Sequence, residues 1–130
     1  WPGHIKPAVT DFPASTMDIM PTIVDLLDLP KDSQLAVRDG ESIASLFKGK
    51  TPKRTHGIPF RFTKNAALID GDYKLVNTNQ KNEDGWKLYD LKNDRTELHD
   101  LAASQPELVA RLSAMWQQWY DSSQRATNAD

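Results

Sequence analysis

The position of one proline limits the fold of this 130-residue chain more than any other feature. A proline inside a helix removes a backbone hydrogen bond and collides with the carbonyl four residues earlier. In the apolar stretch 15–27 this restriction is met if Asp18 is the N-cap, because Pro21 then stands at the third helical position, where its missing N–H needs no partner. Apolar side chains cover most of the circumference, and only Asp18, Thr22 and Asp25 form a narrow polar stripe. We therefore predict a helix that is buried, against a sheet.

A second helix is predicted near the C-terminus from the spacing of its large apolar residues. They recur at helical intervals and form one stripe: Leu108, Val109, Leu112, Met115, Trp116, Trp119 and Tyr120. An aromatic stripe is also compatible with a carbohydrate-binding platform. However, every aromatic residue here shares the face of Leu108 and Leu112, so the spacing favours packing against a core.

Four short strands are predicted between the helices, at 58–62, 66–69, 73–76 and 86–89. Pro59 places the first strand at an edge of the sheet or at a strand start. Asp70-Gly71 predicts a two-residue hairpin with a type I′ turn. The fold class is therefore α+β, with a small antiparallel sheet of about four strands packed by the C-terminal helix and preceded by the buried helix. The basic, proline-bearing connection 51–56 is the expected boundary between the two parts.

Composition excludes several classes of function. The formal charge of −2 is too small to indicate a nucleic-acid partner or a membrane surface. The chain has no cysteine, which excludes disulfides and thiolate metal sites without deciding the compartment. The three histidines show no ligand spacing, so we expect no metal site within the chain.

Several short segments together resemble the late part of the sulfatase fold, in the alkaline-phosphatase superfamily. In chain order they are Trp1-Pro2-Gly3, Asp18-Ile19-Met20-Pro21-Thr22, Asp39-Gly40-Glu41-Ser42-Ile43, Asp70-Gly71-Asp72-Tyr73-Lys74-Leu75-Val76, and Leu88-Tyr89-Asp90-Leu91 with Glu97-Leu98-His99-Asp100-Leu101-Ala102. The chain departs from the family at His99-Asp100, where an Asn is usual. The spacing of the first two segments is most similar to the arylsulfatase and N-acetylgalactosamine-6-sulfatase branch.

The resemblance implies a C-terminal portion of a calcium-dependent sulfatase. Such enzymes use a formylglycine made from the first residue of a Cys/Ser-x-Pro-Ser-Arg motif, and this chain has no such motif. Thr51-Pro52-Lys53-Arg54 has the wrong first residue and the wrong spacing. Residues 1–50 would then be the end of the catalytic α/β domain, with the buried helix at its edge, and residues 51–130 the C-terminal subdomain. The nucleophile and the calcium ligands are expected upstream, and this chain alone is expected to hydrolyse nothing.

Arg61 and Lys64 are the candidate substrate-binding residues. The segment 60–65 matches the strand and loop that, in sulfatases, reach the rim of the substrate pocket. A guanidinium offers a planar fork for sulfate or carboxylate, and an ammonium offers a mobile point charge. His4, after the Trp-Pro-Gly turn, is a further candidate for the active-site side. All three have a plain alternative as solvated surface residues.

The resemblance implies two partners, namely the rest of the catalytic domain and a sulfated small molecule or glycan, and a periplasmic or secreted location. No nucleic-acid or membrane partner is expected. Two other functions stay open at this point. One is a phosphodiesterase or phosphonate hydrolase of the same superfamily, since the Asp-x-x-Pro-Thr helix is shared beyond sulfatases. The other is a non-catalytic interaction module.

Overall fold

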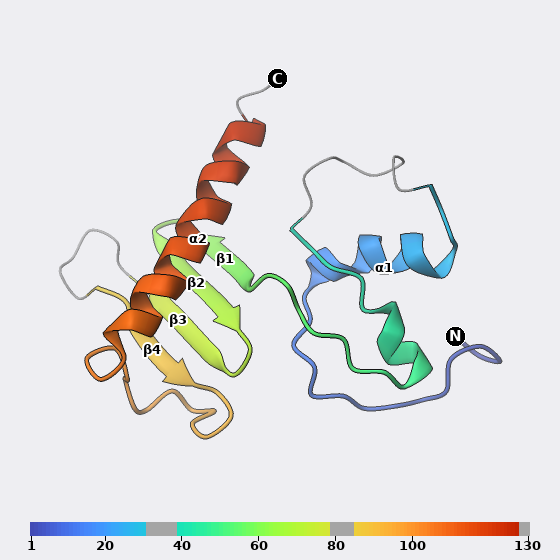
Figure 1. Cartoon of the computed structure of the whole chain (residues 1–130), viewed down its shortest axis with the longest axis horizontal. Coiled ribbons are helices and arrows are strands. Elements are labelled where there is room, and N and C mark those ends of the chain that lie inside the picture. Colours follow the sequence, from blue (N-terminus) through green and yellow to red (C-terminus); the bar gives the residue numbers. More distant parts are fainter. Residues whose placement is uncertain (31–38, 79–84, 128–130) are drawn as a thin grey trace. The chain divides into compact units, whose positions relative to one another are not determined.

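The computed structural model describes residues 1–30, 39–78 and 85–127 (Figure 1). The chain divides into two compact units, Trp1–Thr55 and His56–Asp130. The division falls inside the basic connection 51–56.

The first unit contains the proline-bearing helix. Helix α1 spans Ile19–Leu26 and follows a 3₁₀ turn at Thr16–Asp18. Pro21 is therefore at the third position of α1, as predicted, and its side chain is buried. A short 3₁₀ helix, Ala44–Lys48, ends at Gly49, whose φ of 72° is in the left-handed region that glycine adopts without strain.

Helix α1 is buried on only part of its surface, which includes the apolar Pro21 and Val24. The buried side chains include the polar ones, Asp18 and Thr22. Ile19, Met20 and Ile23 are instead 57%, 62% and 41% exposed. The predicted burial of the helix therefore holds for Pro21 and Val24, whereas it is wrong for Ile19, Met20 and Ile23. The physical reason is that hydrogen bonds and an ion pair at Asp18 and Thr22 hold one side of α1 to its own unit, and no described segment of that unit covers Ile19, Met20 and Ile23.

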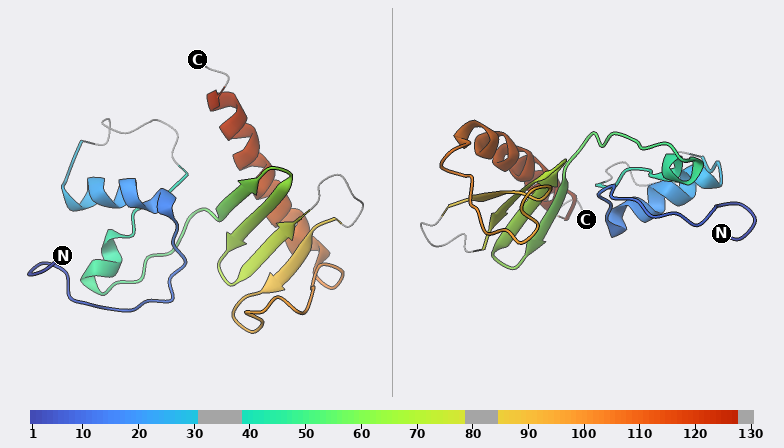
Figure 2. Two further views of the ribbon diagram at one scale, coloured as in Figure 1. Left: turned by 180° about the vertical axis from the view of Figure 1, so that it is seen from behind. Right: turned by 90° about the horizontal axis from the view of Figure 1, so that it is seen from below.

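The second unit is built on a four-stranded antiparallel sheet. The strands are β1 (Ile58–Phe62), β2 (Asn65–Asp70), β3 (Tyr73–Asn77) and β4 (Lys87–Asp90), and they pair in the order β1-β2-β3-β4. The strands are joined in sequence order, so the sheet is a simple meander (Figure 2). The predicted α+β class and the predicted strands are confirmed.

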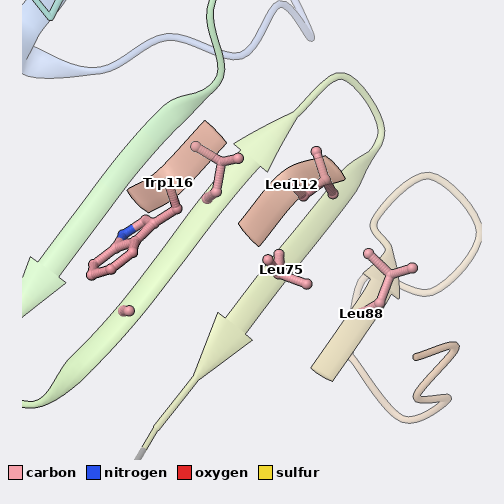
Figure 3. Close-up of a cluster of buried hydrophobic side chains, with 6 residues drawn as sticks. Leu75, Leu88, Leu112 and Trp116 are labelled. Atoms are coloured by element: carbon pink, nitrogen blue, oxygen red, sulfur yellow. The ribbon is translucent and has the colours of Figure 1, made fainter. Parts of the chain in front are cut away.

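Helix α2, Pro106–Thr127, covers one face of this sheet (Figure 1). The helix begins with Pro106, whose fixed φ and missing N–H suit the first helical position. Leu112 and Trp116 from α2 meet Leu75 and Leu88 from the strands in the core (Figure 3). The other members of the predicted stripe pack against this core: Leu108, Val109, Met115, Trp119 and Tyr120. The periodicity therefore identified a core face, as predicted.

The turn between β2 and β3 differs from the prediction. The pairing of Asp70 with Tyr73 makes Gly71 and Asp72 the two loop residues. A type I′ turn needs positive φ at both loop positions. Gly71 has a φ of 59°, whereas Asp72 is not among the described residues with positive φ. Glycine at the first loop position is typical of a type II′ turn, so the type I′ prediction is wrong.

The two edges of the sheet are closed in different ways. β1 is one edge, and Pro59 in it lacks the N–H that could pair with another strand. At the other edge, the Leu101 N–H donates to the Leu88 carbonyl at 2.8 Å, and the Leu88 N–H donates to Asp100 Oδ1 at 3.1 Å. The segment after β4 thus occupies the free side of that strand.

Within the described ranges, no helix is both long enough and apolar enough to cross a membrane.

Candidate functional site

The predicted substrate-binding residues Arg61 and Lys64 lie on one hairpin of the second unit. Phe62 pairs with Asn65, so the β1–β2 turn consists of Thr63 and Lys64 alone. Thr63 has a φ of 53°, a strained conformation for a β-branched residue. Lys64 is exposed at the tip of this turn, and among the described residues no partner is recorded for its ammonium group. The short turn therefore presents Lys64 on a rigid support.

Arg61 is oriented by two contacts. Its guanidinium carbon lies 4.1 Å from the centre of the Tyr120 ring, a cation–π geometry. Its Nε donates to the Thr63 carbonyl at 3.3 Å. Arg61 therefore lies on the α2 side of the sheet. Within the described part of the chain its two terminal nitrogens make no recorded hydrogen bond, so they can serve an anionic ligand.

His4 lies in the other unit. The centre of its ring is 4.4 Å from that of the Trp1 ring, with the planes at 37°, and the backbone N–H of His4 donates to the Trp1 carbonyl at 3.0 Å. The side chain is exposed. The structure thus places Arg61 and Lys64 on one hairpin, and His4 in the other unit.

The most constrained polar group of the first unit was not predicted. The Asp18 carboxylate is fully buried and faces Arg54, whose Nη1 lies 2.8 Å from Oδ2 and whose Nη2 lies 3.1 Å from Oδ1. The backbone N–H groups of Ser15 and Glu41 also donate to it, both at 2.8 Å. Burial opposes the charge of Asp18, but these hydrogen bonds outweigh burial and lower the pKa of the carboxyl below its ordinary value of 3.8.

Two segments of the family resemblance meet at this cluster. Thr22 Oγ1 donates to the Asp18 carbonyl at 2.6 Å and accepts from the Ile43 N–H at 3.0 Å. Gly40 lies against the backbone of Met17, and a Cβ at Gly40 would overlap the Met17 carbonyl. The Asp-Gly-Glu-Ser-Ile turn therefore binds the start of α1. The cluster explains why an acid, a hydroxyl and a glycine are needed at these positions.

Arg54, in the basic connection 51–56, is held by the first unit. The basic run of Lys48, Lys50, Lys53 and Arg54 reads as a solvated linker, yet the Arg54 side chain is only 8% exposed and is ion-paired. The next backbone N–H, that of Thr55, lies 3.0 Å from both carboxylate oxygens of Glu41. The connection is therefore fastened to the first unit up to the point where the chain divides.

The remaining resemblance segments meet in the second unit. Lys74 Nζ pairs with Glu97 Oε1 at 2.6 Å, joining β3 to the segment after β4. Asp100 Oδ1 accepts from the N–H groups of Leu88 and Ala102, at 3.1 and 2.9 Å. An Asn oxygen, usual for the family, would accept the same two bonds, so the Asp preserves this structural role.

A metal site is not visible in the part of the chain that the structure describes. In those residues, no group of three His, Cys, Asp or Glu side chains is placed to hold an ion. Asp18 is already occupied by Arg54 and backbone donors, which leaves it poorly suited to a cation. Any calcium bound by the complete protein remains a prediction about other residues.

Comparison with known proteins gives related sequences and structures, while no protein-family model matches the chain. The chain is 28% identical over 126 residues to an uncharacterised sulfatase of Schizosaccharomyces pombe, covering 89% of this chain and 23% of that protein. It is 24% identical over 127 residues to an N-acetylgalactosamine-6-O-sulfatase of Bacteroides thetaiotaomicron, covering 88% of this chain and 25% of that protein. A solved structure of Ps i-CgsB, in complex with k-i-k-neocarrahexaose, matches at 28% identity with a TM-score of 0.73, over 92% of this chain and 27% of that one.

The chain therefore spans about a quarter of the length of these relatives. Relatives named as sulfatases cover nearly all of it, which confirms the resemblance stated from the sequence and is consistent with a C-terminal sulfatase portion. The name sulfatase denotes a sulfuric ester hydrolase, and that activity belongs to the complete relatives.

Proposed function

We propose that this chain is the C-terminal part of a sulfatase that hydrolyses sulfate monoesters, and that it supports the catalytic domain and supplies one wall of the substrate pocket. The observation that carries the proposal is the coverage: relatives named as sulfatases match 88–89% of this chain but only 23–25% of their own length. In the proposal, the formylglycine nucleophile and the calcium ion that stabilises charge on the sulfate belong to the rest of the protein.

Arg61 is the residue proposed to contact the substrate. Its contacts with Tyr120 and with the Thr63 carbonyl fix the guanidinium, so little side-chain entropy is lost when an anion binds. Its terminal nitrogens are a planar fork that matches sulfate or carboxylate oxygens. Lys64, in the turn that follows β1, would add a mobile positive charge. Together they would select anionic or polar groups on the organic part of the ester.

The proposed substrate class is a sulfated sugar. One relative is named as an N-acetylgalactosamine-6-O-sulfatase, and one similar structure holds an oligosaccharide. A sugar with further polar or anionic groups extends beyond the reacting sulfate, whereas a small aryl sulfate does not. The pocket wall should therefore matter for the first substrate and not for the second.

The test compares two substrates in the complete protein. Arg61→Ala should lower kcat/KM for the sulfated sugar by about ten- to a hundredfold, the equivalent of one charge-assisted hydrogen bond of about 1.5–3 kcal/mol. Hydrolysis of a small aryl sulfate should stay within about twofold. Arg111→Ala is the matched control, because Arg111 is an exposed arginine of the same unit that pairs with Asp70 at 2.9 Å.

Three results would contradict the proposal at different points. Equal losses of kcat/KM for both substrates would mean that Arg61 contacts the reacting sulfate or stabilises the fold, and that it does not select the organic part of the substrate. No loss would make Arg61 a solvated surface charge. Cleavage of a phosphate diester in place of any sulfate ester would reject sulfatase chemistry in favour of the related phosphodiesterases.

A further inference from the structure

A second polar groove lies in the unit His56–Asp130, away from Arg61 and Lys64. It has a volume of about 300 Å³ and is lined mainly by Lys74, Val76, Thr78, Lys87, Tyr89 and Glu97. Leu75 and Leu88, the neighbours of these residues in β3 and β4, point into the core under α2. Successive side chains of a strand point to opposite faces, so the groove is on the face of the sheet that α2 leaves open.

The described residues that line the groove carry one excess positive charge. Lys74 Nζ is ion-paired with Glu97 Oε1 at 2.6 Å, and both side chains are half-buried. Lys87 is exposed, and within the described residues no carboxylate is recorded as its partner. Two ammonium groups therefore face one carboxylate, and the excess charge belongs to Lys87.

The backbone around Glu97 fixes one side of the groove. Glu97 has a φ of 56°, in the left-handed region that non-glycine residues rarely adopt. Its N–H donates to the Asp94 carbonyl at 3.2 Å, and its carboxylate holds Lys74. Strained residues of this kind cluster at binding sites. The Lys74 ammonium is thus held in place, whereas no carboxylate among the described residues holds the Lys87 ammonium.

The aromatic member of the groove is Tyr89. It pairs with Lys74 across β3 and β4, and Val76 pairs with Lys87, so the two lysines are diagonal neighbours on this face. An aromatic ring offers an apolar surface and a polar tip. Together with the Thr78 hydroxyl, this arrangement suits a ligand that combines an anion, an apolar ring face and hydroxyl groups.

We propose that this groove binds a sulfated sugar residue, with its sulfate on the ammonium groups of Lys87 and Lys74 and its ring against Tyr89. The volume is at the lower end of the range of about 300–1,000 Å³ for small-molecule pockets, which fits a single sugar residue. The choice of a sulfated sugar rests on the proposed function, whereas the cationic groove itself does not. The site is separate from Arg61, which lies on the opposite, α2-covered face of the sheet. It would hold a sugar unit without hydrolysing it.

The test is a binding titration of the 130-residue chain followed by the NMR shifts of its backbone amides. The probe is N-acetylgalactosamine 6-sulfate, with unsulfated N-acetylgalactosamine and sodium sulfate as comparison ligands. The sulfated sugar should shift the amides of Lys74, Val76, Lys87 and Tyr89. Lys87→Ala should raise the Kd at least about tenfold, as expected for the loss of a charge-assisted contact.

Lys92→Ala is the matched control, because Lys92 is an exposed lysine of the same unit that faces Asp72 at 4.0 Å and does not line the groove. Its Kd should stay within about twofold of the unmodified chain. If Lys87→Ala disturbs the whole spectrum, Lys87→Gln keeps the side-chain length and tests the charge alone. No shifts in the groove, an equal response to sodium sulfate, or equal losses in the Lys87 and Lys92 variants would each overturn the proposal. Because binding needs no turnover, these failures are distinct from a failure of the proposed hydrolase activity.

Discussion

Trp116 should be the side chain on which the second unit depends most. It is 3% exposed, its ring stacks on Tyr120 with centroids 5.2 Å apart and planes at 8°, and it meets Trp86 edge-on at 5.7 Å. Its Nε1 donates to the Phe60 carbonyl at 3.0 Å, which ties α2 to the edge strand β1. The residue therefore contributes both apolar burial and a hydrogen bond between two elements.

Trp116→Ala should lower the free energy of unfolding by about 3–5 kcal/mol, the usual cost of removing a buried aromatic side chain. A unit of roughly 75 residues has a total stability of only about 4–11 kcal/mol, so this change removes a large share of it. Trp116→Phe keeps a ring in the core but leaves the Phe60 carbonyl without its donor. It should therefore cost less, about 1–3 kcal/mol.

The assay is urea unfolding of the full chain followed by far-ultraviolet circular dichroism. Trp1→Ala is the matched control, because Trp1 is exposed and lies in the other unit. It should leave the transition of the second unit unchanged. A urea midpoint for Trp116→Ala within error of the unmodified chain would falsify the assignment of Trp116 to the core.

Three further predictions concern the first unit and the chain as a whole. The pKa of Asp18 is lowered in the fold, so its ion pair stabilises the unit fully above about pH 3.8, and this stabilisation is lost as the pH falls through the pKa of the folded state. An NMR titration of the carboxyl carbon should show the lowered pKa, and Arg54→Ala should raise it. Gly40→Ala should destabilise the first unit by more than about 2 kcal/mol, because the new Cβ would overlap the Met17 carbonyl; amide exchange that stayed as slow as before would contradict this. The isolated chain should release no phenol from an aryl sulfate in the presence of calcium, and turnover abolished by a chelator would refute the assignment of the nucleophile to other residues.

Elements with strong local patterns could be predicted from the sequence. The stripe from Leu108 to Tyr120 and the four strands follow from helical spacing, alternation and turn residues. Pro21 fixed the start of α1 to within a residue, because sterics leave few positions for it. Such features depend on neighbours in the chain, which the sequence displays directly.

Features that depend on distant residues were missed. Arg54 and Asp18 are 36 positions apart, so neither the ion pair nor the burial of Asp18 and Thr22 could be read from local spacing. The contact of Arg61 with Tyr120 joins β1 to α2 in the same way. The roles of Arg61, Lys64 and His4 in binding stay predictions. The groove at Lys87 was missed because its lining comes from β3, β4 and residues beyond the strand ends, and the sequence does not show that these segments lie side by side.

The closed edges of the sheet have a consequence for association between copies of the chain. An open strand edge is a template on which another copy can add a strand, and repeated addition leads to fibrils. Here Pro59 interrupts the donors of β1, and the segment of Asp100 and Leu101 occupies β4. We therefore expect strand-by-strand polymerisation to require two separate events, the detachment of the 100–101 segment at one edge and a substitution at Pro59 at the other. Variants that keep both features should stay free of cross-β assemblies even when the core is weakened.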